Sequence, residues 1–230
     1  MERFSYARSR PARTQSAQIR QRVLHLLNRL AADATSSGNT RAMSSSAYDT
    51  AWVARVRDPA DPDRLAFPSA LAWLLHHQHA DGHWGSPFPY SVLPSMAALV
   101  ALRRAPPSPS TGMAAQRALA YLQRALSGWS LAACDTPYIE FLLPRIAQEL
   151  VHDGVTLPVP DLDAMQARSA EKRRLIPLCT LYSGQSPLLH VLEAFGDELD
   201  FRRLRGQQSP DGGYGCSPSA TAAVLIAASE

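Results

Sequence analysis

An eight-residue pattern, Gln-x-x-Asp-Gly-x-aromatic-Gly, occurs twice in this sequence and limits what the chain can fold into. The matched positions are Gln78, Asp81, Gly82, Trp84 and Gly85 in the first copy, and Gln208, Asp211, Gly212, Tyr214 and Gly215 in the second. Asp-Gly favours a tight turn because glycine adopts positive φ and the Asp side chain hydrogen-bonds the turn backbone. The aromatic ring then covers the turn. Two unrelated turns are the alternative, but five shared positions in eight favour a repeated packing unit without a catalytic role.

The stretch Ser45–Val56 predicts the start of a helix. Either Ser46 or Asp49 caps the free backbone N–H groups at its first turn. Tyr48 and Trp52 add large rings to an otherwise small apolar body. We therefore expect this stretch to pack against the helix that ends in the first turn.

Helical spacing of apolar residues recurs along the rest of the chain. The expected helices span residues 19–30, 67–79, 94–104, 113–126, 136–150, 162–174, 187–195, 200–208 and 219–228. No run of four or more residues alternates with the period of a strand, and residues 58–63 are expected to form a solvated, proline-broken loop. Helix pairs joined by short turns predict an all-α fold, an α/α-barrel-like array.

Composition narrows the class of protein further. The 230 residues suit one large domain or one and a half, and 46% of them are hydrophobic, which is enough for a core. The longest apolar runs fall short of the ~20 residues that span a bilayer. A net charge of +3 is too weak to indicate nucleic-acid binding. Three widely spaced cysteines suit a reducing, cytoplasmic setting better than disulfides or zinc.

The N-terminal residues differ from the remainder. Residues 1–17 hold four arginines and one acid, which predicts a disordered basic tail, with an organelle transit peptide as the alternative. Residues 18–35 contain a leading amphipathic helix. Residues 44–230 are the expected helical domain.

Two other groups of residues bear on possible chemistry. Histidines 76, 77, 79 and 83 cluster, but a turn separates the last two, so no metal site is expected. Glu140 precedes the apolar Phe141, so we expect partial burial, which raises the pKa of a carboxyl group.

Five blocks in this order resemble class II diterpene cyclases, the copalyl diphosphate synthase group. They are Ser46–Ala54 (Ser-Ala-Tyr-Asp-Thr-Ala-Trp-Val-Ala), Asp81–Tyr90, Ile139–Pro144 (similar to Phe-Glu-x-x-x-Pro), Leu188–Phe195 and Ser217–Ala223. The resemblance covers residues 44 to 228, nearly the whole chain.

The resemblance implies an all-α enzyme built from β and γ domains. Such an enzyme protonates geranylgeranyl diphosphate, assisted by Mg²⁺, and closes it to a copalyl-type diphosphate. The acid is the middle Asp of an Asp-x-Asp-Asp motif in the β domain, and the pocket lies between β and γ. Glu140 has a structural role in the family.

This sequence departs from the family at the catalytic acid. It has no Asp-x-Asp-Asp, and Asp161-Leu162-Asp163-Ala164 lacks the final Asp and lies too early in the chain. We therefore expect residues 44–230 to be a γ-type domain and 18–35 a β-type leading helix, without the catalytic β domain and inactive alone. The alternatives are a stand-alone γ-type pseudoenzyme or subunit that pairs with a separate β chain, and an unrelated α/α-barrel binding protein.

Two further positions follow from the resemblance. Tyr182 stands where plant ent-type enzymes have a His, eight residues before the His of the Leu-Leu-His block, that helps hold a water acting as base. Tyr182 is thus a pocket candidate, with an ordinary core or pocket-wall role as the alternative. Only Asp135 stands where some plant members have an acidic cluster tied to Mg²⁺, so no metal ligand is assigned to this chain.

Overall fold

Helix α2 (Ala47–Val53) begins the described part of the chain. The Ser46 hydroxyl accepts a hydrogen bond from the Asp49 backbone N–H at 3.0 Å, so Ser46 is the N-cap. Ala51 and Trp52 are buried. The predicted helix start is confirmed, and the Asp49 carboxylate accepts a hydrogen bond from the Ser46 hydroxyl at 2.6 Å.

A computed structural model describes residues 45–130, 136–183 and 186–229. Residues Ser45–Glu230 belong to one compact unit. The expected basic tail (1–17) and leading helix (18–35), and Asp135, lie outside the described residues.

The described chain is mostly helical. The further α-helices are α3 (Pro68–His76), α4 (Val92–Arg104), α5 (Pro109–Leu126), α6 (Ile139–His152), α7 (Leu162–Arg174) and α8 (Pro218–Ser229). The 3₁₀ segments are η2 (Leu178–Leu181), η3 (Pro187–Ala194), η4 (Gly196–Glu198) and η5 (Phe201–Gln207). Among the described helices, none is long and apolar enough to cross a membrane. The predicted all-α class is confirmed, with the two adjustments that follow.

The expected loop at residues 58–63 is a small antiparallel hairpin, so the prediction of helices alone was wrong there. Strands β1 (Arg57–Asp58) and β2 (Asp61–Leu65) pair with each other. The turn is held by side chains, since Asp58 accepts from the Ala60 N–H at 2.9 Å. Strand β1 has two residues, and four of the five residues of β2 are exposed, so neither strand has an alternating apolar pattern and the sequence showed only the turn residues.

Residues 187–195 and 200–208 were expected to form α-helices, and the structure has 3₁₀ segments there. Within η3, Val191 has non-helical angles (φ −134°, ψ 33°), so the segment is kinked. A 3₁₀-helix is wound more tightly than an α-helix and its hydrogen-bond geometry is poorer, so runs without a kink are short. Helix α5, in contrast, starts four residues earlier than the expected Met113, because Ser108 and Thr111 form a capping box ahead of it.

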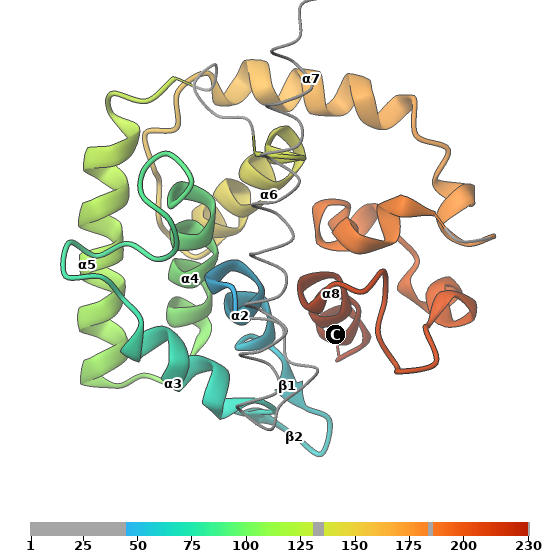
Figure 1. Ribbon diagram of the computed structural model, residues 1–230, viewed down its shortest axis with the longest axis horizontal. Helices are drawn as coiled ribbons and strands as arrows, with labels where there is room; N and C mark the ends of the chain where they lie inside the picture. The colour runs from blue at the N-terminus through green and yellow to red at the C-terminus, as the bar shows by residue number, and fades with distance from the viewer. Residues whose placement is uncertain (1–44, 131–135, 184–185, 230) are drawn as a thin grey trace, which may run out of the picture. The chain divides into compact units, whose positions relative to one another are not determined.

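Five elements contact one another in a closed order: α2 with α4, α4 with α6, α6 with η3, η3 with α8, and α8 with α2. A second set contacts this inner ring from outside. Helix α3 contacts α2 and α4, α5 contacts α4, α7 contacts α6, and η5 contacts α8. In Figure 1, α5 and α7 lie at the periphery and α2, α4 and α6 lie nearer the centre. This is the α/α-barrel-like arrangement predicted from the paired helices and repeated turns.

Helix α4 is the most buried element. Its apolar side chains point in every direction, and its residues from Met96 to Leu102 are almost fully buried. A helix that is apolar all round belongs in the interior of a protein. The helix ends in two charged residues, Arg103 and Arg104.

Candidate functional site

The first Gln-x-x-Asp-Gly turn ties α3 to α5. Gln78 Nε2 donates to the carbonyl oxygens of Gly82 at 3.0 Å and of Ala114, in α5, at 2.9 Å. Trp84 is completely buried, and its indole Nε1 donates to the Leu74 carbonyl at 2.8 Å. One amide and one ring thus join the turn to the two helices beside it.

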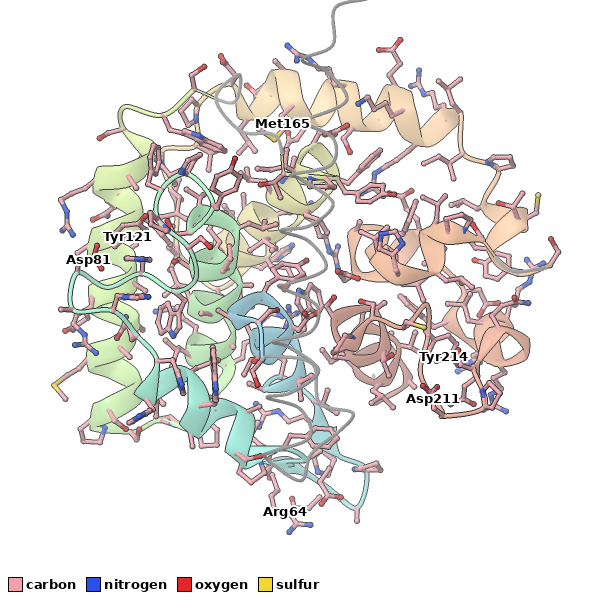
Figure 2. The ribbon with its side chains drawn as sticks, viewed as in Figure 1. Arg64, Asp81, Tyr121, Met165, Asp211 and Tyr214 are labelled. Atoms are coloured by element: carbon pink, nitrogen blue, oxygen red, sulfur yellow. The ribbon has the colours of Figure 1, made fainter. Side chains whose placement is uncertain are left out.

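The second turn repeats the hydrogen bond between the glutamine amide and the glycine carbonyl. Gln208 Nε2 donates to the Gly212 carbonyl at 2.8 Å, and Asp211 accepts from the Gly213 N–H at 3.0 Å. The Tyr214 N–H donates to the Thr221 hydroxyl of α8 at 3.0 Å. Figure 2 labels Asp211 and Tyr214 at this turn. The repeated pattern therefore produces a repeated hydrogen-bonded turn.

The two turns differ in the residue that follows the aspartate and glycine. In the first, His83 Nδ1 lies 2.6 Å from Asp81 Oδ1, and the His83 ring is stacked on His79 with centroids 4.2 Å apart. Desolvation alone would raise the pKa of Asp81, but hydrogen bonds from the His83 side chain and backbone lower it. Tyr121 lies 5.1 Å from the His83 ring, and Figure 2 shows Asp81 and Tyr121 close together. In the second turn, Gly213 takes the place of His83, so nothing equivalent forms.

A buried polar centre joins α2, η3 and α8. Glu193 is 3% exposed, and its Oε1 accepts from the Ser219 hydroxyl at 2.9 Å and from the Tyr48 hydroxyl at 3.3 Å. Asp49 accepts from the Ser219 N–H at 3.2 Å. Burial raises the pKa of Glu193 to about 7, against hydrogen bonds that lower it. Burial, followed by the charge of Glu193, also raises the pKa of Tyr48 well above its usual value.

A cavity of about 230 Å³, here called the arginine cavity, opens at one end of the inner ring. It is lined by Trp52, Arg55, Arg104, Arg145, Gln148, Glu149, His152, Glu193, Gly196, Phe201, Ala223, Ile226 and Ala227. Many of these residues stand at or just after the C-terminal ends of α2, α4, α6 and α8. Arginine is favoured at such ends because the helix dipole is negative there.

The arginine cavity contains a network around Glu149. The Glu149 carboxylate lies 2.6 Å from Arg55 Nη2, 3.1 Å from Arg104 Nη1 and 3.4 Å from Arg145 Nε. Arg104 also pairs with Asp153 at 3.0 Å. The Arg55 guanidinium lies over the Trp52 ring, 4.0 Å from its centroid. Burial lowers the pKa of Arg55, and the charge of Glu149 opposes that shift.

A larger cavity of about 540 Å³ lies among α6, α7 and η3–η4. Arg173 lies 5.4 Å from the ring centroids of both Phe141 and Phe195 and pairs with Glu198 at 2.5 Å. Aromatic faces attract cations. In this cavity the guanidinium group of Arg173 already lies over the rings of Phe141 and Phe195.

Glu140 does not behave as a buried acid. Its side chain is 25% exposed and pairs with Lys172 of α7. Desolvation alone would raise the pKa of Glu140, but the hydrogen bond and charge of Lys172 outweigh it, and the pKa is lowered. The expectation that burial raises this pKa was wrong, because the partner from α7 was not visible in the sequence.

Tyr182 is held by the segment that follows it in the chain. Its hydroxyl accepts from the Asp200 N–H at 2.9 Å, and its carbonyl accepts from Gln207 Nε2 at 3.1 Å. The Arg203 guanidinium lies 4.3 Å from the ring centroid. Tyr182 lines neither of the two cavities described above. Its assignment as a pocket residue stays a prediction.

Metal-ligating side chains are not gathered in the described part of the chain. No group of three or more His, Cys, Asp or Glu residues there has a geometry that would hold a metal ion.

Two residues at the centre of these polar networks were not singled out from the sequence. Glu193 is the one acid in the Leu188–Phe195 block, and Arg55 is the one basic residue in Ser45–Val56. The signal that could have found them is a single acid or a single base among the residues of a block. Neither shows its partners in the sequence, because these lie on other elements.

These features define the class: a helical barrel domain with repeated turns and a buried polar centre. No family model matches the sequence. The bifunctional premutilin synthase of Clitopilus passeckerianus is 32% identical over 192 residues, which cover 80% of this chain and 20% of that protein.

Two solved structures are similar to this one. Abietadiene synthase from Abies grandis matches with a TM-score of 0.73 and 28% identity, over 81% of this chain and 25% of that chain. The ent-copalyl diphosphate synthase of Arabidopsis thaliana matches with a TM-score of 0.69 and 27% identity, over 81% of this chain and 28% of that one.

The chain belongs to the diterpene synthase family, and its helical domain resembles those of the class II diterpene cyclases. It spans about a fifth to a quarter of the length of the relatives that it matches.

Proposed function

We propose that this chain is the γ-domain portion of a class II diterpene cyclase. The complete enzyme would convert geranylgeranyl diphosphate to a copalyl-type diphosphate by protonation, with Mg²⁺ assisting. A β domain outside this sequence would supply the acid, and the γ domain would supply one wall of the pocket between them.

The observation that carries this proposal is the match to ent-copalyl diphosphate synthase over 81% of this chain but 28% of that one. Such a match suits one domain of a larger enzyme. The Arabidopsis synthase was solved in complex with (S)-15-aza-14,15-dihydrogeranylgeranyl thiolodiphosphate, an analogue of the proposed substrate.

The chemistry explains why the domain would be inactive alone. Protonating an alkene requires a carboxylic acid that keeps its proton in a site from which water is excluded, because water quenches the cation. The sequence has no Asp-x-Asp-Asp, and the pKa of Glu140 is lowered, so Glu140 is ionised. Glu193 is the other carboxyl group to consider, because burial raises its pKa to about 7. One of its two carboxyl oxygens, Oε1, already accepts hydrogen bonds from Tyr48 and Ser219.

A reducing compartment such as the cytoplasm is proposed for the protein. Cys179 and Cys216 are free and exposed, which suits such a compartment. No nucleic-acid partner is proposed, given the net charge of +3.

The experiment is a reconstitution. Purified chain 1–230 with geranylgeranyl diphosphate and Mg²⁺ should yield no bicyclic product after dephosphorylation and gas chromatography. Adding a separately expressed β domain of a copalyl diphosphate synthase should restore turnover and should co-elute with the chain in gel filtration. The control is the same β domain with its catalytic Asp replaced by Asn, which should bind without turnover. Bicyclic product from the chain alone would contradict the proposal.

A further inference from the structure

Helix α8 packs on the inner ring through small side chains. Its buried apolar residues are Ala220, Ala222, Ala223 and Val224. Helix α4, in contrast, buries one methionine and three leucines. Because the stabilisation from burial grows with the apolar area removed from water, α8 is held by less apolar contact than α4. Its main contacts are with α2, η3 and η5.

A polar contact between α8 and the ring is made by Ser219, in the first turn of the helix. The Ser219 hydroxyl donates to Glu193 Oε1 of η3 at 2.9 Å, and the Ser219 N–H donates to Asp49 of α2 at 3.2 Å. The Tyr48 hydroxyl of α2 donates to the same Glu193 oxygen at 3.3 Å. Helix α8 has no charged residue, so no side chain of its own can neutralise a charge on Glu193.

Glu193 lies where a negative charge is costly. The residue is 3% exposed, and its Oε2 has no hydrogen-bond partner among the described residues. Burial, helped by the charge of Asp49, raises the pKa of Glu193 to about 7, although the bonds from Ser219 and Tyr48 lower it. A buried charge is tolerated only where it is paired and hydrogen-bonded. The packed arrangement therefore binds the proton of Glu193 more tightly than an arrangement in which water reaches the carboxyl group.

We propose that Glu193 is a pH-sensitive switch for α8. When the carboxyl group ionises, α8 separates from α2 and η3 as a unit, while α4, α5 and α6 stay folded. Opening brings water to Glu193 and breaks only the contacts of small side chains, so the deeply packed α4 need not unfold. Local opening of this kind draws on the least stable parts of a fold. The inference does not depend on the proposed cyclase function, since it concerns elements of this domain only.

Other titratable or charged groups are close to this carboxyl group. Helix α2 supplies Tyr48 and Asp49. The arginine cavity, whose lining includes Glu193, is also lined by Arg55, Arg104, Arg145, Glu149 and His152. Among the charged groups of that lining, Glu149 pairs with Arg55 and Arg104. Histidine also changes charge near neutral pH, so His152 is the side chain to be separated from Glu193 by experiment.

Native-state hydrogen exchange of the full chain tests the proposal. Exchange of the α8 amides is measured at pH 6 and pH 8 in low urea and corrected for the intrinsic effect of pH. Glu193 titrates at about 7 when α8 is packed and at the ordinary 4.5 when it is open, so the open population should rise about tenfold between these pH values. The α8 amides should also exchange faster than those of α4 and depend less on urea, because local opening exposes less surface. Exchange of α8 and α4 with equal protection and equal urea dependence would overturn the separate opening of α8.

Two variants assign the pH effect to one side chain. Glu193→Gln keeps the shape of the carboxyl group and cannot ionise, so the tenfold rise should disappear. His152→Gln is the control, and it should retain the rise. A rise that persists in Glu193→Gln, or one that is lost in His152→Gln, would overturn the role of Glu193.

A further pair of variants keeps the test valid if Glu193→Gln fails to fold. Ser219→Ala removes the hydroxyl of α8 that donates to Glu193, so the open population of α8 should rise severalfold at both pH values. Ser127→Ala is the matched control, because it removes an exposed hydroxyl that donates to the Arg124 carbonyl of α5, and it should leave α8 unchanged. Circular dichroism checks the fold of each variant. Equal α8 exchange in the wild type and a folded Ser219→Ala would contradict the proposal.

Discussion

Tyr48 and Glu193 are 145 residues apart in the sequence, yet the Tyr48 hydroxyl donates to Glu193 Oε1 across the inner ring at 3.3 Å. Ser219 shares the same acceptor oxygen, so the carboxyl group joins α2, η3 and α8. The first and last helices of the ring are thereby linked through one buried acid.

The stability of the fold should depend on the protonation of Glu193. Burial raises the pKa of Glu193 from the ordinary 4.5 to about 7. Between these values the folded state holds a proton that the unfolded state has released, so stability falls as pH rises across this window. Glu193→Gln should remove that slope and gain up to ~3 kcal/mol over the wild type above pH 7. Urea denaturation at a series of pH values measures it, and parallel curves for both proteins would show the assigned pKa to be wrong.

Trp84→Ala should unfold or aggregate the protein. The indole is completely buried and donates to Leu74, and deleting such a ring costs ~3–5 kcal/mol. Phe67→Ala is the control, because Phe67 is 44% exposed, and it should lower the melting temperature far less. An unchanged melting temperature for Trp84→Ala would mean that the ring has no packing role.

The two matched glycines should respond differently to substitution. Gly82 (φ 105°) and Gly212 (φ 88°) are both in the left-handed region, where an added Cβ costs ~1–2 kcal/mol. At Gly82 the Cβ would also lie well inside 3.0 Å of the Arg117 carbonyl, whereas at Gly212 the nearest atom is Gln208 Nε2 at 3.8 Å. Gly82→Ala should therefore destabilise more than Gly212→Ala in thermal unfolding. Equal losses would show that backbone conformation alone decides the cost.

Neutralising two glutamates of α6 should separate a buried network from a surface pair. Glu149→Gln leaves the guanidinium groups of Arg55 and its neighbours without their shared carboxylate, and breaking a buried pair costs ~3–5 kcal/mol. Glu140→Gln removes a partly exposed pair with Lys172, which contributes ~0–1 kcal/mol. Chemical denaturation of both variants tests the ranking, and a larger loss for Glu140→Gln would reverse it.

Much of the fold could be predicted because its signals are local. The Ser46 cap, the two turns and most helix spans depend on residues a few positions apart. The hairpin at β1 and β2 was missed, since β1 has two residues and β2 is exposed at four of its five, so neither alternates between apolar and polar residues. The 3₁₀ form of η3 and η5 was missed as well, because the spacing of apolar residues in so short a segment does not distinguish the two helix types.

The candidate site was harder to predict. Glu140 was expected to be the acid that burial perturbs, but Lys172 from α7 lowers its pKa. Glu193, which looks equally ordinary in sequence, lies where three elements meet. The pKa of a carboxyl group depends on its surroundings in space, and nearby sequence describes only part of them.

The sequence by itself determined the helical class, the repeated turns and the resemblance to diterpene cyclases, because composition, periodicity and motif order are properties of the chain. Only the tertiary structure decided that Arg55 meets Glu149, 94 residues away, and that the C-terminal ends of the inner helices face one cavity. The physical reason is that charge, burial and hydrogen bonding act through space. Groups from separate helices therefore acquire their properties only when the ring closes.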